Sequence, residues 1–391
     1  PVGLVVSARA SGLVAAARGL RALERCGPRG LTVASWLETG AAGPGPALRR
    51  ARAPWRGALN ARTRNEIYAA IWRNAAQQIG ADVVELGGGF LEARRGGARS
   101  RIFQQIVALD DPVTLRLALD KPVARRLLAA ERIPVAGQLV ISLADLEAAE
   151  RFLERHHVCV VKPAGKAGGD GTTTGVRTGP QLLRAYVHAA RGGGRVLLEQ
   201  QIEGTVHRLL LLDGELLDVL RHDRPQLTGD GHSTVEQLVR AENSRRAEAG
   251  GDLGLAFLEL GLDARLTLSR QGLSPNSVIG AGHRFAVCTV TNDSPVDDSH
   301  TILTGVCEPV VDAARRAAQA VGLRLAGVDV IAPSLDRPLE ECGGVIAEVN
   351  GNPGIHHHYL VADRPAARDV AVPILKAALS PLVPGGDSAL T

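Results

Sequence analysis

The sequence has 391 residues, of which 45% are hydrophobic, 22% are charged and only 3% are aromatic. These proportions are typical of a globular protein with two or three packed domains and an aliphatic core. The formal net charge of +4 is small, and no basic run is interleaved with aromatic residues, so a nucleic-acid-binding surface is not expected.

Neither a membrane span nor a secretory leader is expected. The apolar runs are interrupted by charges and are too short to cross a bilayer. Residues 3–17 are mildly apolar, but their start reads better as a first strand than as a signal peptide. The five cysteines are scattered, without a CxxC pair or a histidine at metal-ligand spacing, which indicates reduced thiols and a cytoplasmic protein.

Residues 1–110 predict a small α/β unit. Strands are expected at 2–7, 30–35 and 82–85, helices at 12–25 and 63–80, and a Gly/Pro-rich loop at 40–54. A hairpin turned at Gly96-Gly97 should follow. No helix follows the triple glycine at 87–89, so we interpret it as a turn and not as a phosphate loop.

From residue 111 the pattern predicts a larger unit of mixed helices and strands. Helices are expected at 111–119, 121–131, 143–156, 179–190, 231–246, 308–322 and from 366 onward. Strands are expected at 133–142, 158–162, 195–200, 206–212, 215–222, 285–291, 327–331 and 345–349. Ser233 or Thr234 should cap the helix at 231–246, and residues 247–280 give no clear pattern.

The last two strands carry three candidate metal ligands. Alternation points Asp329 to one face of its strand, and Glu348 and Asn350 to one face of the partner strand. Two carboxylates and an amide oxygen suit Mg²⁺, which completes its octahedron with water and phosphate oxygens, or Mn²⁺ in its place. The alternative is a solvated hairpin with incidental acids.

A loop of small residues, PAGKAGGDGTTTGVRT, follows the strand at 158–162. Its glycines can bring several backbone N–H groups against one anion. Lysine is rare in this sequence, and both Lys162 and Lys166 flank the loop. We expect a flap over phosphates, and the alternative is a surface glycine loop. The candidate phosphate contacts in the flap are Gly168, Gly169, Gly171 and Thr172.

Two further stretches place polar groups at strand ends. The segment Glu199-Gln200-Gln201-Ile202-Glu203-Gly204 can offer backbone groups to an adenine edge and a carboxylate to a ribose hydroxyl. Arg208 and Arg221 each lie in an apolar hairpin, where an inward-pointing arginine requires an anion. An exposed strand end and outward-pointing arginines are the alternatives.

The run His356-His357-His358 follows the strand of the metal ligands. Three consecutive side chains cannot converge on one ion from an extended segment, so we expect a substrate-facing loop here. The alternative is a polar loop with no role. Asn292, next to Asp293, lies at a strand end before the helix at 308–322 and is a further candidate for a substrate contact.

In this order the elements from about 111 to 360 resemble the ATP-grasp superfamily. The matching features are Lys121 in LDKPVARRLLAAERIPV, a strand lysine before a Gly-rich flap, an E-x-x-I-x-G segment, and the D…E-x-N set in EVNGNPG. The stretch DRPQLTGDGHSTVEQLVRAENSRR is similar to a segment of the ATP-grasp domain of cyanophycin synthetases and of related bifunctional glutathione synthetases.

The resemblance implies an ATP-grasp fold over 111–391, with a central and lid part at about 111–200 and a C-terminal part at about 201–391. A pre-grasp α/β domain would occupy 1–110. It implies a ligase that joins a carboxylate to an amine through an acyl phosphate and releases ADP and phosphate. The implied substrates are small molecules, namely amino acids or peptides. By analogy it implies a homodimer or homotetramer.

The resemblance also implies roles for individual residues. Lys121 and Lys162 would hold ATP phosphates, Glu199 and Ile202 would lie at the adenine, and Gln200 would lie beside them. Asp329, Glu348 and Asn350 would hold Mg²⁺. Arg221 would face the acyl phosphate or the γ-phosphate, with Arg208 as a second catalytic candidate. His358 falls at a histidine of the cyanophycin-type motif and would contact substrate.

Two departures from the pattern affect these expectations. Val206 stands where the superfamily usually has an acid that holds ribose, so Glu203 is the expected replacement. Residues 1–110 do not resemble the N-terminal domain of cyanophycin synthetases. Two alternatives remain: a ligase of a non-amino-acid amine or a thiol, and a non-catalytic ATP-binding regulatory module. The retained metal set disfavours the module.

Overall fold

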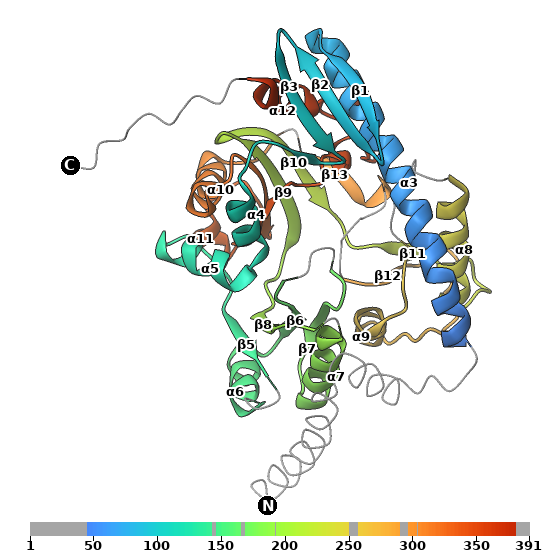
Figure 1. The fold of residues 1–391 in the computed structure, drawn as a ribbon. Helices are drawn as coiled ribbons and strands as arrows, with labels where there is room; N and C mark the ends of the chain where they lie inside the picture. Colours follow the sequence, from blue (N-terminus) through green and yellow to red (C-terminus); the bar gives the residue numbers. More distant parts are fainter. Residues whose placement is uncertain are drawn as a thin grey trace, which may run out of the picture.

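The computed structural model describes residues 45–142, 146–165, 169–191, 193–249, 257–289, 296–302 and 304–380. The strands expected at 2–7 and 30–35 and the helix expected at 12–25 lie outside these residues. The described strands form four sheets, and every paired strand in them is antiparallel (Figure 1). The mixed, α+β character expected from the sequence is confirmed.

A long helix and a four-stranded sheet form the N-terminal unit. The helix is α3 (Gly45–Ile79), and the sheet runs in the order β1 (Asp82–Gly87), β2 (Phe90–Arg95), β3 (Ala98–Phe103) and β4 (Ile106–Val107). The expected loop at 40–54 is wrong from Gly45 onward, because this stretch is rich in the strong helix formers Ala, Leu and Arg. The expected hairpin is confirmed, since Arg95 pairs with Ala98.

The described residues of the N-terminal unit share their core with the rest of the chain. Tyr68 and Trp72 of α3 belong to one buried cluster with Ile102 of the sheet, Leu210 of the central sheet and Ile374 of α12 (Ala371–Leu379). The first figure shows α12 lying against the sheet of the N-terminal unit. The described residues on both sides of position 110 therefore pack together, and a domain boundary there stays a prediction.

The central sheet has five strands. Their order is β13 (Ser299–Thr301), β10 (Glu215–His222), β9 (Thr205–Leu212), β14 (Leu325–Ala332) and β15 (Val345–Gly351). Leu209 and Leu211 of β9 pack in the cluster on one face of this sheet, whereas Leu210 and Leu212 pack in the cluster of the N-terminal unit. Burial on both faces explains the continuous apolar run of this strand.

Helices α4 (Pro112–Leu119), α5 (Lys121–Ala130) and α10 (Glu308–Val321) cover one face of the central sheet. The first two confirm the helices expected from residue 111. They are capped by Asp111 and Asp120, whose carboxylates accept hydrogen bonds from backbone N–H groups of the first turn. The short helix α11 (Leu339–Cys342) connects the last two strands, and η3 (Ile355–His358) and η4 (Arg364–Ala366) lie between the last strand and α12.

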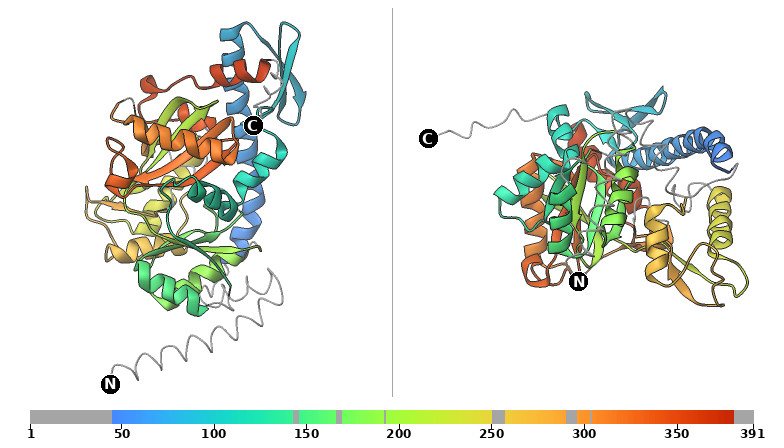
Figure 2. Two further views of the ribbon diagram at one scale, coloured as in Figure 1. Left: turned by 90° about the vertical axis from the view of Figure 1, so that its left-hand side faces the viewer. Right: turned by 90° about the horizontal axis from the view of Figure 1, so that it is seen from below.

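A second four-stranded sheet, here called the small sheet, faces the central sheet. Its order is β5 (Gln138–Ile141), β8 (Val196–Gln200), β6 (Cys159–Pro163) and β7 (Thr173–Val176). Helices α6 (Leu146–His156) and α7 (Gly179–Ala190) pack on one face of it, as Figure 2 also shows. Alternation sends Val161 into that core and leaves Lys162 for the opposite face.

Residues 226–289 add a further small unit. It contains β11 (Gln226–Thr228), α8 (Val235–Ala249), α9 (Leu262–Arg270) and β12 (Arg284–Ala286), followed by η2 (Val296–Asp298). Thr234 caps α8 as expected, and its capping-box partner is Gln237. The strand expected at 285–291 is shorter, and α9 lies in the stretch that gave no clear pattern. The expected C-terminal helix begins at Ala371 instead of 366.

Candidate active site

A cavity of about 1220 Å³ lies between the small sheet and the central sheet. Lys162 and Glu199 line it from the small sheet, and Arg208, Asp329 and Glu348 line it from the central sheet. Two sheets that face each other across a polar cleft can enclose a charged ligand from both sides. Most of the candidates from the sequence lie on these walls.

The three candidate metal ligands lie together on β14 and β15. Asp329 and Glu348 are directly opposite each other in the ladder. Asn350 Nδ2 donates to Asp329 Oδ2 at 3.0 Å. The ladder then shifts by one residue, which leaves Ala347 of β15 as a bulge. As strand alternation predicted, the three side chains lie together at one place on the cavity wall.

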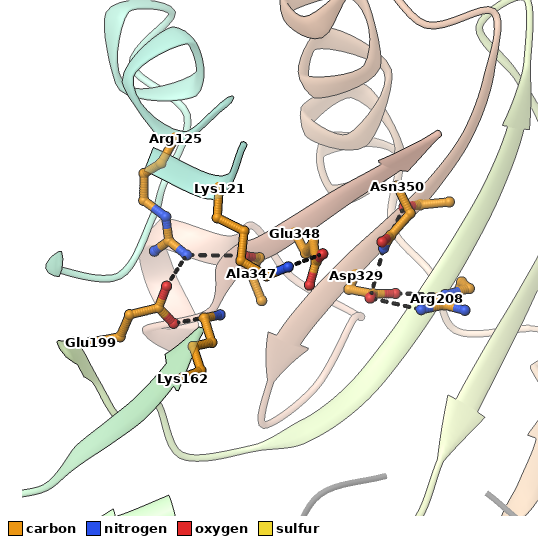
Figure 3. Close-up of polar contacts among 10 residues, drawn as sticks. Lys121, Arg125, Lys162, Glu199, Arg208, Asp329, Ala347, Glu348 and Asn350 are labelled. Carbon is orange, nitrogen blue, oxygen red and sulfur yellow. Dashed lines mark hydrogen bonds and ion pairs between the residues drawn. The ribbon is translucent and has the colours of Figure 1, made fainter. Parts of the chain in front are cut away.

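Both carboxylates of this cluster are ion-paired with cations of the protein. Lys121 Nζ lies 2.9 Å from Glu348 Oε1. Arg208 donates two hydrogen bonds to Asp329, at 2.7 and 2.8 Å, and Figure 3 shows both pairs side by side. Fork-to-fork pairs of this kind are among the strong ion pairs. A divalent cation that binds here would displace these two cations from the carboxylates.

Glu199 lies between two further cations. Its Oε2 is 2.7 Å from Lys162 Nζ and its Oε1 is 3.1 Å from an Nη of Arg125. Because this buried carboxylate bridges two cations, it links β6, which carries Lys162, to α5, which carries Arg125. Gln200 and Ile202, the other adenine candidates, line the cavity directly.

Arg125 was not found from the sequence. It is buried, and its guanidinium also donates to the carbonyls of Ala136 and of the bulge residue Ala347, at 2.8 and 3.0 Å. It thus joins α5, the small sheet and the strand of the metal ligands (Figure 3). The signal that could have revealed it is its place, four residues after Lys121, on the buried stripe of α5.

The glycine flap lines the cavity with Gly169, Asp170, Thr172 and Thr174. Gly171 is buried with φ +81° and lies against Pro163 instead of on the wall. Lys166 and Gly168 lie outside the described residues. The flap ends in β7, which is tied to the small unit that contains α9.

Asp263 of α9 makes that tie. Its carboxylate accepts from the backbone N–H of Thr174 at 2.9 Å and from the Thr174 hydroxyl at 2.7 Å. Its second oxygen accepts from the N–H of Thr289 at 2.8 Å, and Thr289 also lines the cavity. The end of the flap and the 257–289 segment therefore share one buried carboxylate.

The two catalytic candidates differ in position. Arg208 lines the cavity, whereas Arg221 does not line it and instead pairs with Asp223, which does. Glu203 is exposed and is not among the lining residues, so the geometry gives no support to a ribose contact there. Asn292, like Asp293, lies outside the described residues.

The histidine run is helical and buried, so the expected extended loop is wrong. Ile355–His358 form the 3₁₀ helix η3, in which all three histidines are buried. His356 and His357 line the cavity, whereas His358 is fully buried and its Nδ1 lies 2.7 Å from Asp218. The compact turn brings two neighbours of His358, and not His358 itself, to the cavity.

Burial keeps these imidazoles neutral. Desolvation, helped by nearby cations such as Arg64 and Arg208, lowers the pKa of His356 to about 3. Desolvation likewise lowers the pKa of His222 to about 3, and it lowers the pKa of His357 well below its usual value. For His358 the neighbouring Asp218 partly opposes the effect of burial.

These shifts predict that acid destabilises the fold. A histidine in the unfolded chain binds a proton below about pH 6.5, whereas His222 and His356 in the native state do so only near pH 3. The unfolded state therefore binds more protons in this window, and the free energy of unfolding falls as the pH drops from about 6.5, by about 1.4 kcal/mol per pH unit and histidine. Urea unfolding between about pH 7 and about pH 5 measures this slope.

A matched pair of variants tests the assignment. His356→Gln should make the pH dependence less steep, and substitution of an exposed histidine, His283→Gln, should change it much less. Equal slopes in the wild-type protein and His356→Gln would contradict the neutral buried imidazole.

Within the part of the chain that the structure describes, no three His, Cys, Asp or Glu side chains are gathered for a metal, and no helix is both long and apolar enough to cross a bilayer.

Comparison with known proteins identifies the fold. No protein-family model matches the chain. The chain is 32% identical over 249 residues to a cyanophycin synthetase from Nostoc sp., a match that covers 62% of this chain and 27% of the relative. The crystal structure of a bifunctional glutathione synthetase from Pasteurella multocida has a TM-score of 0.50 with it, at 22% identity, over 78% of this chain and 42% of that one.

The chain has the ATP-grasp fold. It is also 27% identical over 295 residues to the glutathione biosynthesis bifunctional protein GshAB from Listeria welshimeri, over 74% of this chain and 38% of the relative. The cavity between the small sheet and the central sheet therefore lies in the part of the chain that has this fold. The chain spans less than a third of the length of the cyanophycin synthetases that it matches.

Proposed function

We propose that this ATP-grasp chain is a carboxylate–amine ligase that forms an amide or peptide bond through an acyl phosphate and releases ADP and phosphate. The observation that carries the proposal is the facing arrangement of Lys162 on the small sheet and Lys121, Asp329 and Glu348 beside the central sheet, all on one cavity. The matches to a cyanophycin synthetase and to a glutathione synthetase support the same reaction class.

The residues fit a divalent metal ion. Asp329, Glu348 and Asn350 offer two carboxylates and an amide oxygen, which are hard donors of the kind that Mg²⁺ and Mn²⁺ prefer. Such an ion would neutralise charge on the transferred phosphoryl group. We propose Mg²⁺ as the ion, held by these three residues together with phosphate oxygens.

The cations of the site are proposed to bind ATP phosphates by an exchange of partners. Lys121 and Arg208 neutralise Glu348 and Asp329 in this structure. If those carboxylates turned to a metal ion, the two cations would become available for phosphate oxygens, and the protein's own charge in the cleft would stay the same. Lys162 remains beside Glu199 and adds a third positive charge.

Phosphoryl transfer depends mainly on positioning and charge neutralisation, and these groups supply both. The carboxylate substrate attacks the γ-phosphate to give the acyl phosphate, and the amine then displaces phosphate from it. The flap at 169–175, tied through Thr174 to Asp263, would exclude water from the acyl phosphate. Gln200 and Ile202 are the proposed contacts to adenine. For Arg221, His358 and Asn292 the proposal of a functional role rests on the sequence alone.

Trapping with hydroxylamine tests the proposal without knowledge of the amine. Hydroxylamine converts an acyl phosphate to a hydroxamate, so a panel of amino acids and peptides can be screened as carboxylates with Mg-ATP. We expect hydroxamate and ADP in equal amounts with some members of the panel. A ligase of thiols would instead need a thiol for product formation. Tight Mg-ATP binding without ADP release from any carboxylate would favour the non-catalytic module.

A cytoplasmic location and a homodimeric or homotetrameric state stay predictions. Mass determination in solution tests the second of these. The free thiols of Cys159, Cys288, Cys307 and Cys342 agree with the expectation of reduced cysteines in the described part of the chain.

A further inference from the structure

The cavity extends beyond the two facing sheets to the N-terminal unit. Arg64 of α3 and Gln105, in the turn between β3 and β4, both line it. Neither residue was a candidate from the sequence, and both precede the part of the chain that resembles the ATP-grasp superfamily. The N-terminal unit therefore supplies a wall of its own to the proposed active site.

Arg64 is carried on a helix surface that is fixed to the cavity wall. Tyr68 lies one turn further along α3 and is 1% exposed. Its hydroxyl is 2.7 Å from Nδ1 of His356, and the two rings meet edge to face with centroids 5.3 Å apart. Because His356 also lines the cavity, this contact holds the neighbouring turn of α3, and Arg64 with it, at the same end of the cleft.

Gln105 is fixed by its neighbour Gln104. Gln104 has φ +52°, and its side chain donates to Asn65 Oδ1 at 2.7 Å while its carbonyl accepts from Trp72 Nε1 at 2.8 Å. The turn is thus clamped onto α3. Among the described residues no group donates a hydrogen bond to Gln105 Oε1, which is buried. A buried acceptor without a hydrogen bond is costly, so a ligand donor placed there would be favoured.

These groups define the chemistry that this end of the cavity accepts. A guanidinium carries a permanent charge and matches a carboxylate with two parallel hydrogen bonds. Gln105 Oε1 can accept a hydrogen bond, and an N–H group beside a carboxylate is a donor that fits it. His356 and His357, which border the same end, are uncharged and do not compete for an anion.

We propose that Arg64 and Gln105 form a substrate subsite that binds a carboxylate together with a neighbouring N–H group, as found at one end of an amino acid or a peptide. Arg64 is then a specificity-determining residue contributed by the N-terminal unit. The inference rests on the proposed ligase function, because it names the substrate class of that cleft. The carboxylate can belong to the donor of the acyl group or to the amine.

Direct binding tests the subsite independently of turnover. The probes are common amino acids and dipeptides, each paired with the corresponding amine that lacks the carboxylate, titrated calorimetrically into the full chain with Mg²⁺ and a non-hydrolysable ATP analogue. We expect the wild-type protein to bind some carboxylated probes and to bind their partners about 10–100-fold more weakly. Arg64→Gln should weaken the carboxylated probes by a similar factor and abolish the discrimination.

Two variants control for the fold and for general charge. Arg62→Gln removes an exposed arginine from the same helix, 82% exposed and paired with Glu66, and should leave every affinity unchanged. Arg64→Lys keeps the charge without the planar fork and should retain part of the discrimination, which a merely structural arginine would not do. If Arg64→Gln melts early, Arg64→Lys carries the test.

Turnover then identifies which substrate uses the subsite. With hydroxylamine as the amine, a rise in KM for the carboxylate in Arg64→Gln, at little change in kcat, assigns the subsite to the acyl donor. A rise only in KM for the natural type of amine assigns it to the acceptor. Equal binding of both members of each pair, unchanged binding in Arg64→Gln, or no binding of any carboxylated probe would overturn the subsite. Binding without ADP release would instead overturn the ligase function and leave the subsite standing.

Discussion

Glu348→Gln is expected to lower the rate of substrate-dependent ADP formation by about 10²–10³-fold, the usual scale for loss of one group that stabilises transition-state charge. The carboxylate of Glu348 lies opposite Asp329 in the ladder. Together with Asn350, these two residues are the oxygen donors that we assign to the metal ion. Glutamine keeps the shape and one amide oxygen but loses the charge that attracts a divalent ion.

The variant should also change the metal dependence. A neutral ligand binds Mg²⁺ more weakly, so residual activity should require a higher Mg²⁺ concentration than the wild-type protein does. Asn350→Ala removes both an amide oxygen and the hydrogen bond to Asp329, and should reduce activity in the same way. ADP release measured across a Mg²⁺ titration gives both results in one experiment.

Glu341→Gln is the matched control. Glu341 is exposed in the connection between the same two strands, so its substitution changes the charge of the hairpin without reaching the cavity. Melting temperatures check that Glu348→Gln still folds, because it also leaves Lys121 without its carboxylate partner. Near-normal activity in both Glu348→Gln and Asn350→Ala would remove the hairpin from the proposed mechanism.

Arg125→Met should destabilise the protein by about 3–5 kcal/mol, the cost of breaking a buried ion pair by removal of one partner. Met keeps much of the length and volume of the side chain, so the loss is mainly one of charge and hydrogen bonds. The variant leaves Glu199 with only Lys162, and it leaves the carbonyls of Ala136 and Ala347 without this donor. Urea unfolding followed by circular dichroism measures the change.

The same substitution should weaken nucleotide binding, because Arg125 connects the small sheet to the strand of Glu348. Arg125→Lys tests this link: an ammonium retains the charge but cannot reach three acceptors in the plane of a guanidinium. Arg126→Met is the control, since Arg126 follows directly in α5 and is exposed. Stability of Arg125→Met within about 1 kcal/mol of the control would contradict the role assigned to the buried guanidinium.

Much of the local structure is determined by neighbouring residues in the sequence. The turn at Asp213-Gly214 has both residues at positive φ, as a two-residue hairpin requires, and Gly322 ends α10 in the left-handed region. The long helix is the exception: its start at Gly45 rather than 63 shows that helix formers can carry the chain through a stretch that contains Gly and Pro.

The position of the candidate metal ligands also follows from the sequence. Strand alternation alone places Asp329 on one face of its strand and Glu348 with Asn350 on one face of the next strand, and the antiparallel pairing of these two consecutive strands brings them together. Lys121 and Lys162, which were expected site residues, line the same cavity, and the elements that carry them, α5 and β6, were both predicted from the sequence.

What only the tertiary structure decided is which charges meet. The bridge from Arg125 through Glu199 to Lys162 joins residues up to 74 positions apart, and its formation depends on the small sheet facing α5. The cavity wall of Arg64 and Gln105 depends on α3 docking onto η3, and the helical turn of η3 sends His356 and His357, not His358, to that wall. Local propensity acts over a few residues, whereas burial and ion pairing depend on which surfaces pack, and the packing of distant surfaces is not encoded in any single segment.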